Sequence, residues 1–429
     1  MLHIYIRSNL ILFLLFGLAS NSFANATMFS HGNGTSLATD GTVQYLALNG
    51  DLGPVTVVSD AEMVVPVSGV LKILYSRVSA NPNNGGGTQS YTFTVRLNGA
   101  DTAITCAASE TTPTCSDVTN EVSVVAGDLI NLEVVSSGTP TAGNQTGALN
   151  LYSTSSGGAD NSTALMGISS SVAISATVTN YLAPMTYGDP TTVEGDAELL
   201  VAADGVLKNF YIALDGDPDN GAGTQSYAFT VRTNEANISI TCTVSDGSTT
   251  CTDLTNTAAV TAGQRVSISC VPANTPTVRI ARFGLVFVPD IEGLFLTGML
   301  TNDDLNATTV EYNRRLAQGV TWNATESARD TITGSAVVVR TIYVQLTVAP
   351  ANGAGTQSFA FQTRFGAVSN GPGCTIEEAA TTCNSTTEYS SPTLTQVAIR
   401  ATPASTPAVS DAMIGLAWYI RPARRVFVE

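Results

Sequence analysis

The sequence predicts an all-β chain of three tandem antiparallel jelly-roll β-sandwich domains. Three observations predict it: a motif that occurs three times, apolar residues that alternate with period two, and two cysteines at one fixed spacing in every copy. The motif reads GGGTQSYTFTVR at 85–96, GAGTQSYAFTVR at 221–232 and GAGTQSFAFQTR at 353–364. The steps between copies are 136 and 132 residues. Solenoid repeats are much shorter, so each copy can bury its own core.

The N-terminus carries a predicted secretory signal peptide, residues 1–26. Arg7 precedes an apolar run over 10–18, and Ala24 and Ala26 form an A-x-A cleavage pattern. The apolar run is about half as long as the roughly 20 residues that a membrane helix needs. The mature chain, in which we identify no later span, is therefore expected to be secreted and extracellular or at the cell surface, with the periplasm as a further possibility. The repeat steps place the three sandwich domains at 27–155, 156–289 and 290–429.

Charge narrows the classes of partner. Lys and Arg total 18 against 34 Asp and Glu, which gives a formal net charge of −16. Such a surface repels nucleic acid and anionic lipid, so neither is an expected partner. The ordinary role of the charge is to keep a surface rich in Gly, Ser and Thr soluble.

Period-two alternation marks the strands. In the first copy Tyr91, Phe93, Val95 and Leu97 fall on one face, and polar residues fall on the other. Strands of five to eight residues recur with Gly, Asn, Asp and Pro between them, and no segment has a convincing helical stripe. This pattern is typical of a jelly-roll or immunoglobulin-like sandwich. A copy of about 130 residues has room for eight to ten strands, which favours the jelly roll.

The glycine-rich segments before the repeated aromatic strand are expected to be turns, because Gly and Asn tolerate positive φ. In the middle copy the turn contains Asp215, Asp217 and Asp219, which alternate like the first ligands of a calcium loop. The pattern then fails, because Asn220 and Ser226 stand where Gly and Glu would be required. These three aspartates are thus a weak metal candidate, and a polar turn is the alternative.

Six of the seven cysteines share one spacing, C-x8-C, at the same place in each copy. In an exported protein this spacing predicts one local disulfide per copy, closing a strand–loop–strand hairpin. The predicted pairs are Cys106 with Cys115, Cys242 with Cys251 and Cys374 with Cys383. Zinc would need four clustered ligands, and His is nearly absent. Cys270 is left over; the repeat offsets align it with Val134 and Thr402, so we interpret it as a buried small apolar residue, with an intermolecular bridge as the alternative.

Residues for catalysis are scarce, and we expect neither an enzyme nor a cofactor. His31 is the single histidine of the mature chain, so a Ser–His or Cys–His site would have to use it. One acidic pair recurs in two copies and could form a glycosidase site: Asp60 with Glu62, and Asp196 with Glu198. Copy three has Ala328 and Asp330 there, and acidic residues on a solvent-facing strand edge are the ordinary explanation.

Basic residues recur at two places in the repeat. One is Arg96, Arg232 and Arg364; the other is Lys72, Lys208 and Arg340. The first three lie on the strand face opposite the aromatic core residues. They could mark a repeated anion or sugar site, whereas a structural ion pair or a stem packed over the sheet is the simpler interpretation.

The order of elements resembles the C1q/TNF-like jelly-roll superfamily. The matching segments in copy one are SYTFTVRLNG at 90–99, AGDLINL at 126–132 and GALNLY at 147–152; the last recurs as GLVFVP and GLAWYI. The resemblance implies association of three domains through apolar faces. Here three copies lie on one chain, and the strand at 336–348 is apolar on both faces, so a neighbouring copy is expected to cover it. We therefore expect a single-chain pseudo-trimer, with an extended row of domains as the alternative.

Three function classes follow from these observations. The first is a structural or adhesive surface protein whose partners are other copies of itself, surface proteins or glycans. The second is an extracellular ligand-binding module, lectin-like or C1q-like, that uses variable loops. The third, a hydrolase, is disfavoured by the scarcity of histidine. Trp322 and Trp418 both lie in copy three, so no aromatic sugar platform recurs. We expect the structural or adhesive class.

Overall fold

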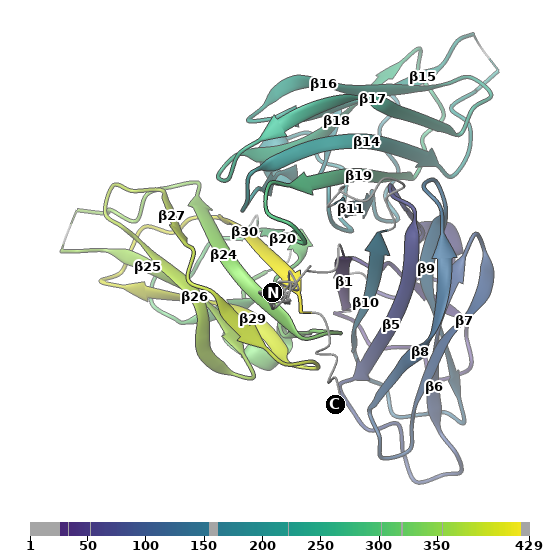
Figure 1. Ribbon diagram of the computed structural model, residues 1–429, viewed down its shortest axis with the longest axis horizontal. Helices are drawn as coiled ribbons and strands as arrows, with labels where there is room; N and C mark the ends of the chain where they lie inside the picture. The colour runs from purple at the N-terminus through teal and green to yellow at the C-terminus, as the bar shows by residue number, and fades with distance from the viewer. Residues whose placement is uncertain are drawn as a thin grey trace, which may run out of the picture.

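A computed structural model describes residues 26–32, 34–51, 53–153, 162–221, 223–301, 303–318, 321–353 and 355–421. The predicted signal peptide lies outside these residues except for Ala26. The described chain forms three two-sheet β-sandwich units arranged as three lobes around a common centre (Figure 1). The only helices in these ranges are three short 3-10 turns, in agreement with the all-β prediction.

The strands and 3-10 helices divide among the units as follows. Unit 1 comprises β1 (Ala26–Gly32), β2 (Gln44–Leu46), β3 (Gly50–Asp51), η1 (Val58–Asp60), β4 (Met63–Val64), β5 (Gly69–Val78), β6 (Ser90–Leu97), β7 (Ala100–Ser109), β8 (Thr114–Val124), β9 (Leu129–Ser137) and β10 (Gln145–Ser153). Unit 2 comprises β11 (Thr163–Ile168), β12 (Asn180–Leu182), η2 (Glu194–Ala197), β13 (Leu199–Leu200), β14 (Gly205–Leu214), β15 (Ser226–Thr233), β16 (Ala236–Ser245), β17 (Thr250–Val260), β18 (Arg265–Ala273) and β19 (Ala281–Pro289). Unit 3 comprises β20 (Phe295–Leu300), β21 (Glu311–Asn313), β22 (Ala317–Gln318), η3 (Glu326–Ala328), β23 (Thr331–Ile332), β24 (Val337–Leu346), β25 (Ser358–Phe365), β26 (Val368–Glu377), β27 (Thr382–Ser385), β28 (Tyr389–Ser391), β29 (Gln396–Ala404) and β30 (Ala412–Ile420).

Each unit pairs its first strand with its last, as a jelly roll does. In unit 1 the inner sheet has the order β3-β1-β10-β5-β8, and the outer sheet has the order β2-β9-β6-β7 with β4 on β9. Unit 2 repeats this as β11-β19-β14-β17 and β12-β18-β15-β16, with β13 on β18. Unit 3 repeats it as β22-β20-β30-β24-β27 and β21-β29-β25-β26, with β23 on β29 and β28 on β24.

The predicted alternation is confirmed in the outer sheets. Tyr91, Phe93 and Val95 are fully buried in the core of unit 1, and their counterparts in the other two units are buried as well. The intervening residues of the same strands are only partly buried. Each sandwich therefore has its own hydrophobic core between two sheets.

The three units pack in a closed cycle. The short strand β4 of unit 1 contacts β11 and β19 of unit 2, β13 of unit 2 contacts β20 and β30 of unit 3, and β23 of unit 3 contacts β1 and β10 of unit 1. The apolar clusters follow the same cycle, since the core of each unit extends onto the inner sheet of the next. The contacts are head-to-tail and close after three units, which gives a pseudo-trimer in one chain.

The strand that is apolar on both faces owes its second apolar face to this cycle. Val338 of β24 belongs to the same buried cluster as the core of unit 2, while Val337 and Val339 belong to the core of unit 3. A strand buried on both sides does not alternate, because neither face meets water.

Backbones approach closely where a unit docks on the next. A Cβ atom at Gly284 would lie 2.7 Å from the Val64 carbonyl oxygen, and one at Gly415 would overlap the Leu200 carbonyl oxygen. At the third interface the small residue is on the other side, because Gly334 faces Ala148. The three interfaces are thus pseudo-equivalent in position and different in shape.

Candidate functional site

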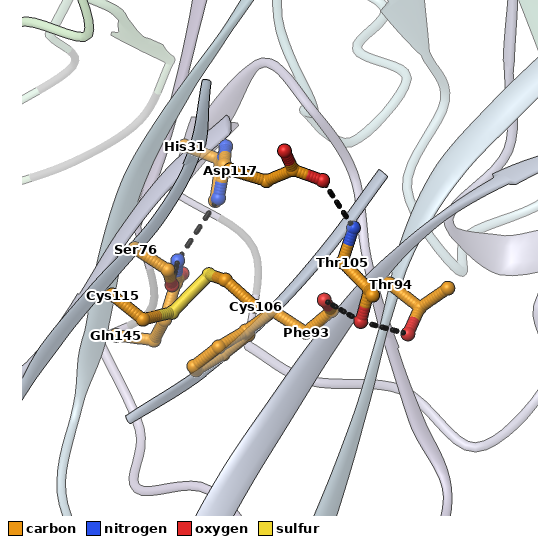
Figure 2. The surroundings of a disulfide bond; sticks show 9 residues. All are labelled: His31, Ser76, Phe93, Thr94, Thr105, Cys106, Cys115, Asp117 and Gln145. Atoms are coloured by element: carbon orange, nitrogen blue, oxygen red, sulfur yellow. Dashed lines mark hydrogen bonds between the residues drawn. A yellow bond between two sulfur atoms is a disulfide. The ribbon is translucent and has the colours of Figure 1, made fainter. Parts of the chain in front are cut away.

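The predicted cysteine pairs are bonded, one in each unit, with Cα atoms 5.6–5.8 Å apart. The predicted strand–loop–strand hairpin is wrong in all three units, however. Cys106 lies on β7 of the outer sheet, and Cys115 lies on β8 of the inner sheet (Figure 2). Consecutive strands cross between the sheets here, so each disulfide closes the open edge of its sandwich.

The other two units need the same correction. Cys242 lies on β16 of the outer sheet and Cys251 on β17 of the inner sheet. In unit 3, Cys374 lies on β26 of the outer sheet, while Cys383 lies on β27 and pairs with Val344 in the inner sheet. A separation of nine residues is long enough for the chain to pass from one sheet to the other, so the spacing fits a crossover as well as a hairpin.

A buried carboxylate organises the chain beside this bridge. Asp117 accepts hydrogen bonds from the backbone N–H groups of Thr105, Thr119 and Asn120. Burial alone would raise the pKa of Asp117, but these hydrogen bonds lower it to about 2. Asp253 has the same partners in unit 2 and a pKa of about 2. Both aspartates are structural, because their acceptor oxygens are already engaged.

His31 is buried in the interior of unit 1, and burial lowers its pKa to about 3. Its Nε2 lies 2.9 Å from the side-chain nitrogen of Gln145, and that nitrogen lies 2.7 Å from Ser76 Oγ (Figure 2). The amide of Gln145 thus separates the hydroxyl from the imidazole, so direct proton transfer between Ser76 and His31 has no path here. The counterparts of His31 are Gly167 and Met299, which carry no polar side chain.

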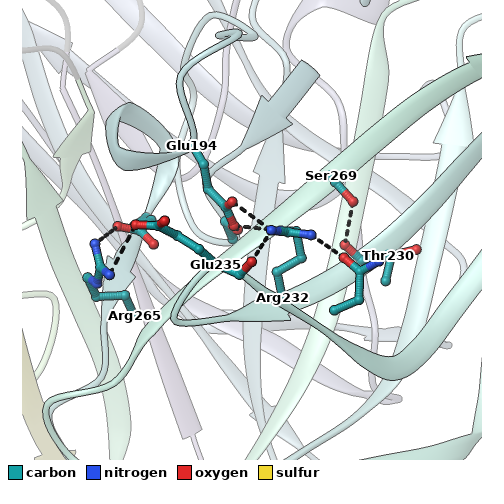
Figure 3. Close-up of polar contacts among 9 residues, drawn as sticks. Glu194, Thr230, Arg232, Glu235, Arg265 and Ser269 are labelled. Atoms are coloured by element: carbon teal, nitrogen blue, oxygen red, sulfur yellow. Dashed lines mark hydrogen bonds and ion pairs between the residues drawn. The ribbon is translucent and has the colours of Figure 1, made fainter. Parts of the chain in front are cut away.

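The recurring arginines form structural ion pairs, as the simpler interpretation held. Arg232 makes a two-pronged contact with Glu194, with Nε–Oε1 2.7 Å and Nη2–Oε2 2.9 Å, and lies over the Tyr181 ring (Figure 3). Unit 3 repeats this as Arg364, Glu326 and Tyr312. Unit 1 keeps the arginine and tyrosine as Arg96 and Tyr45 but takes its carboxylate, Glu133, from β9. These arginines hold the outer sheet to the segment beside it.

The recurring acidic residues lie at unit boundaries, so their interpretation as a solvent-facing edge is wrong for Glu62 and Glu198. Glu62 forms an ion pair with Arg282 of unit 2. Glu198 is 1% exposed, pairs with Arg265 of its own unit and borders β20 of unit 3. In unit 3 the counterpart, Asp330, lies 3.9 Å from Arg77 of unit 1. A carboxylate therefore occurs at the same place in all three interfaces.

The weak metal candidate does not assemble. Asp215 Oδ1 accepts from the N–H of Ile280, and Asp219 Oδ1 accepts from the N–H of Gly221. Asp217 contacts Arg279. Within the ranges that the structure describes, no three His, Cys, Asp or Glu side chains are placed to hold a metal ion.

Cys270 is buried and not disulfide-bonded, and burial raises the pKa of its thiol. It pairs with Phe229 on the core face of β18. The register corrects one alignment: the counterpart of Cys270 in unit 3 is Ala401 opposite Phe361, and Thr402 is one position further along. The offset shortens from 132 to 131 in the segment before β29.

The two tryptophans are both buried and form no exposed platform. Trp418 stacks on the fully buried Arg315, whose guanidinium carbon lies 5.3 Å from the ring centroid. Arg315 also donates to Thr331 Oγ1 and to the Ile332 carbonyl oxygen. The sequence gives no signal for this role. Arg315 supports β23, the strand that docks on unit 1.

The repeated glycine motif forms the outer tips of the three lobes, at the loops β5–β6, β14–β15 and β24–β25 (Figure 1). One asparagine in each tip donates to a carbonyl oxygen of the neighbouring loop: Asn84 to Thr139, Asn220 to Thr275 and Asn352 to Thr406. The motif glutamines, Gln89, Gln225 and Gln357, are buried beneath the tips. The glycines at the apex have positive φ and open space around them. The repetition therefore encodes a hydrogen-bonded loop scaffold with an exposed glycine apex.

A cleft of about 560 Å³ lies between unit 3 and unit 1. Unit 1 contributes Tyr75, Arg77 and Ser116 to its lining, and unit 3 contributes Ile332 and Gln396. Sites of this size with apolar and aromatic walls and a few polar groups are typical of small-ligand binding. The sequence could not indicate this cleft, because its residues come from two repeats.

No protein-family model matches the sequence, and no curated protein matches it. In the described parts of the chain, no helix combines the length and the apolar content needed to cross a membrane.

Proposed function

We propose that the chain is a secreted or surface-exposed structural or adhesive protein, built as a single-chain trimeric head that presents three rigid tips. The observation that carries the proposal is the closed cycle of three disulfide-clipped units, with the same hydrogen-bonded loop at the outer end of each lobe. A head of this kind can contact a surface at several points. Multipoint attachment raises avidity without requiring a strong single contact.

The strand order supports the proposed kinship with the C1q/TNF-like superfamily. The inner sheet runs first, last, third and sixth strand when β2 and β4 are counted as one strand and β3 is left out, and three such sandwiches associate. The disulfides support a location outside the cytoplasm, because reducing compartments rarely keep such bonds. We propose other copies of the chain, surface proteins or glycans as partners, and no catalytic activity.

The test is retention of the mature chain, residues 27–429, on immobilised mucin, on collagen and on a glycan array. Each single change Asn84→Ala, Asn220→Ala or Asn352→Ala loosens one tip and should reduce retention modestly. The triple variant should reduce it much more than the sum of the single effects, because avidity depends on simultaneous contacts. Asn306→Ala, outside the tip loops, is the matched control. Equal retention of the triple variant and the unaltered chain would refute a role for the tips, and no retention on any surface would refute adhesion.

A ligand-binding module is the second candidate, because one specific observation favours it: the cleft between units 3 and 1. It differs from the tips in position and chemistry.

A further inference from the structure

The cleft occurs where one repeat departs from the other two. At the interface of units 2 and 3, the ring of Tyr343 packs directly on Gly263, and a Cβ atom there would lie 3.1 Å from the ring. At the interface of units 3 and 1, the counterparts are Tyr75 and Leu394. A leucine side chain in place of Gly263 prevents the same close packing. The tyrosine and the loop therefore stand apart, and the cleft lies between them.

Leu394 also has an unfavourable backbone conformation. Its φ is 59°, in the left-handed region that a branched, bulky residue rarely adopts. Its counterparts Gly127 and Gly263 have φ of 99° and 90°, which glycine adopts freely. A strained residue that also opens a cleft is a reason to look for a ligand at that place.

The charge in the cleft is positive, on a chain whose net charge is −16. Arg77 is the one charged residue among the described residues that line it, and its counterparts are Ala213 and Gln345. Arg77 Nη1 is 3.9 Å from Asp330 Oδ2, which is too far for a hydrogen bond. Asp330 is itself bonded by the side-chain amide of Gln396. The guanidinium group is about one-third exposed and can donate to a ligand.

The remaining lining matches a hydroxylated ligand. Thr114, Ser116 and Thr395 carry hydroxyl groups, Gln396 carries an amide, and Tyr75 adds an aromatic ring. Aromatic rings pack against the apolar faces of sugars, while hydroxyl and amide groups exchange hydrogen bonds with their rims. A carboxylate on the same molecule would meet Arg77 in a charge-assisted hydrogen bond.

We propose that the cleft between units 3 and 1 binds an acidic sugar, with its carboxylate on Arg77 and its ring beside Tyr75. This site is independent of the tips, so either proposal can fail without the other. The ring hydroxyls contact Gln396 and the hydroxyl side chains. Only one of the three pseudo-equivalent interfaces carries the arginine, so the stoichiometry is one ligand per chain.

The experiment measures binding of D-glucuronate and D-galacturonate to the intact mature chain by calorimetry and saturation-transfer NMR, with methyl glucoside as the neutral probe. Arg77→Gln should weaken binding at least tenfold; it places in the cleft the residue that unit 3 already has at Gln345. Arg340→Gln removes one arginine charge elsewhere in unit 3 and should leave binding unchanged. Added salt should weaken binding, because it screens the Arg–carboxylate attraction.

Leu394→Gly keeps the test decisive if a charge variant misfolds. Glycine accepts the left-handed backbone, so the variant should be at least as stable as the parent, while Tyr75 closes onto the loop and binding is lost. The proposal is overturned by any of three results. These are no binding of either acidic sugar at about 10 mM, equal binding of methyl glucoside, or equal loss of affinity in Arg77→Gln and Arg340→Gln.

Discussion

Arg282 of β19 and Glu62 of unit 1 form an ion pair across a repeat boundary, with Nη2 3.2 Å from Oε2. Arg282 is 4% exposed and also donates to the Ser59 carbonyl oxygen at 3.0 Å. Its counterparts, Thr146 and Met413, cannot form this pair. At the interface of units 3 and 1 the arginine moves to the neighbouring strand, where Arg77 lies nearest Asp330. The cycle therefore uses one acidic position three times with different partners.

Replacing Arg282 by methionine, the residue of unit 3, should destabilise the chain. The change leaves Glu62 buried without its partner, and breaking a buried pair in this way costs about 3–5 kcal/mol. Chemical denaturation at neutral pH would measure the loss in the free energy of unfolding. Adding Glu62→Gln to the same chain should recover much of it, since the uncompensated charge is gone. A double variant as unstable as Arg282→Met alone would show that the pair has no coupling.

The close approach at Gly415 gives a second prediction. Gly415→Ala places a methyl group on the Leu200 carbonyl oxygen, so β13 must move away from unit 3. Overpacking of this kind costs about 1–3 kcal/mol. Gly195→Ala is the matched control, because nothing lies within 4 Å of the Cβ position at Gly195. Thermal unfolding should show a lower Tm for the first variant and little change for the second; equal Tm values would mean that the units do not pack this closely in solution.

Much of the fold follows from residues that recur. The offset of the motif located Tyr45, Tyr181 and Tyr312, which lie beside the recurring arginines. The alternation of Tyr91, Phe93 and Val95 identified the core face. Both signals are local: a strand's two faces and a repeat's length are written in consecutive residues. The jelly roll and the three units could therefore be predicted.

Contacts between units could not be predicted in detail. Glu62 on an exposed strand edge and Glu62 in an interface have the same sequence pattern, and Arg282 is 220 residues away. The C-x8-C spacing suits a hairpin and a crossover between sheets equally well, so the partner sheet of Cys115 was missed, as were those of its counterparts Cys251 and Cys383. The cleft needs Arg77 and Leu394 from different repeats. Such relationships depend on how finished sheets and sandwiches dock, which no periodicity encodes.

The sheet-to-sheet disulfide predicts a local effect of its removal. Cys242→Ser with Cys251→Ser should cost about 2.7 kcal/mol in the chain-entropy account for a loop of about ten residues. Because the bond closes the open edge of unit 2, β16 and β17 should lose protection in hydrogen exchange. The corresponding strands β7 and β8 of unit 1 keep their own disulfide and serve as the internal control. Uniform loss of protection in all three units would instead mean that the bridge acts on the whole cycle.

Two sets of buried carboxylates predict that stability is greatest at mildly acidic pH. Burial raises the pKa of Glu198 to about 7 from an ordinary value of 4.5, although Arg265 opposes the shift. A raised pKa means that the folded state prefers the protonated acid. This contribution is complete below pH 4.5 and is lost as pH rises through 7. Burial also raises the pKa of Glu62 and of Asp330, at the other two interfaces.

Asp117 and Asp253 act in the opposite direction, in a lower window. Their pKa of about 2 lies below the ordinary 3.8, so their contribution is complete above pH 3.8 and is lost as pH falls through 2. Thermal unfolding over the range from about pH 2 to about pH 9 should therefore give the highest Tm near pH 4–5. Glu198→Gln should raise Tm at about pH 8 relative to the unaltered chain, and the difference should shrink toward about pH 5. A difference that does not change with pH would mean that Glu198 does not titrate in this range.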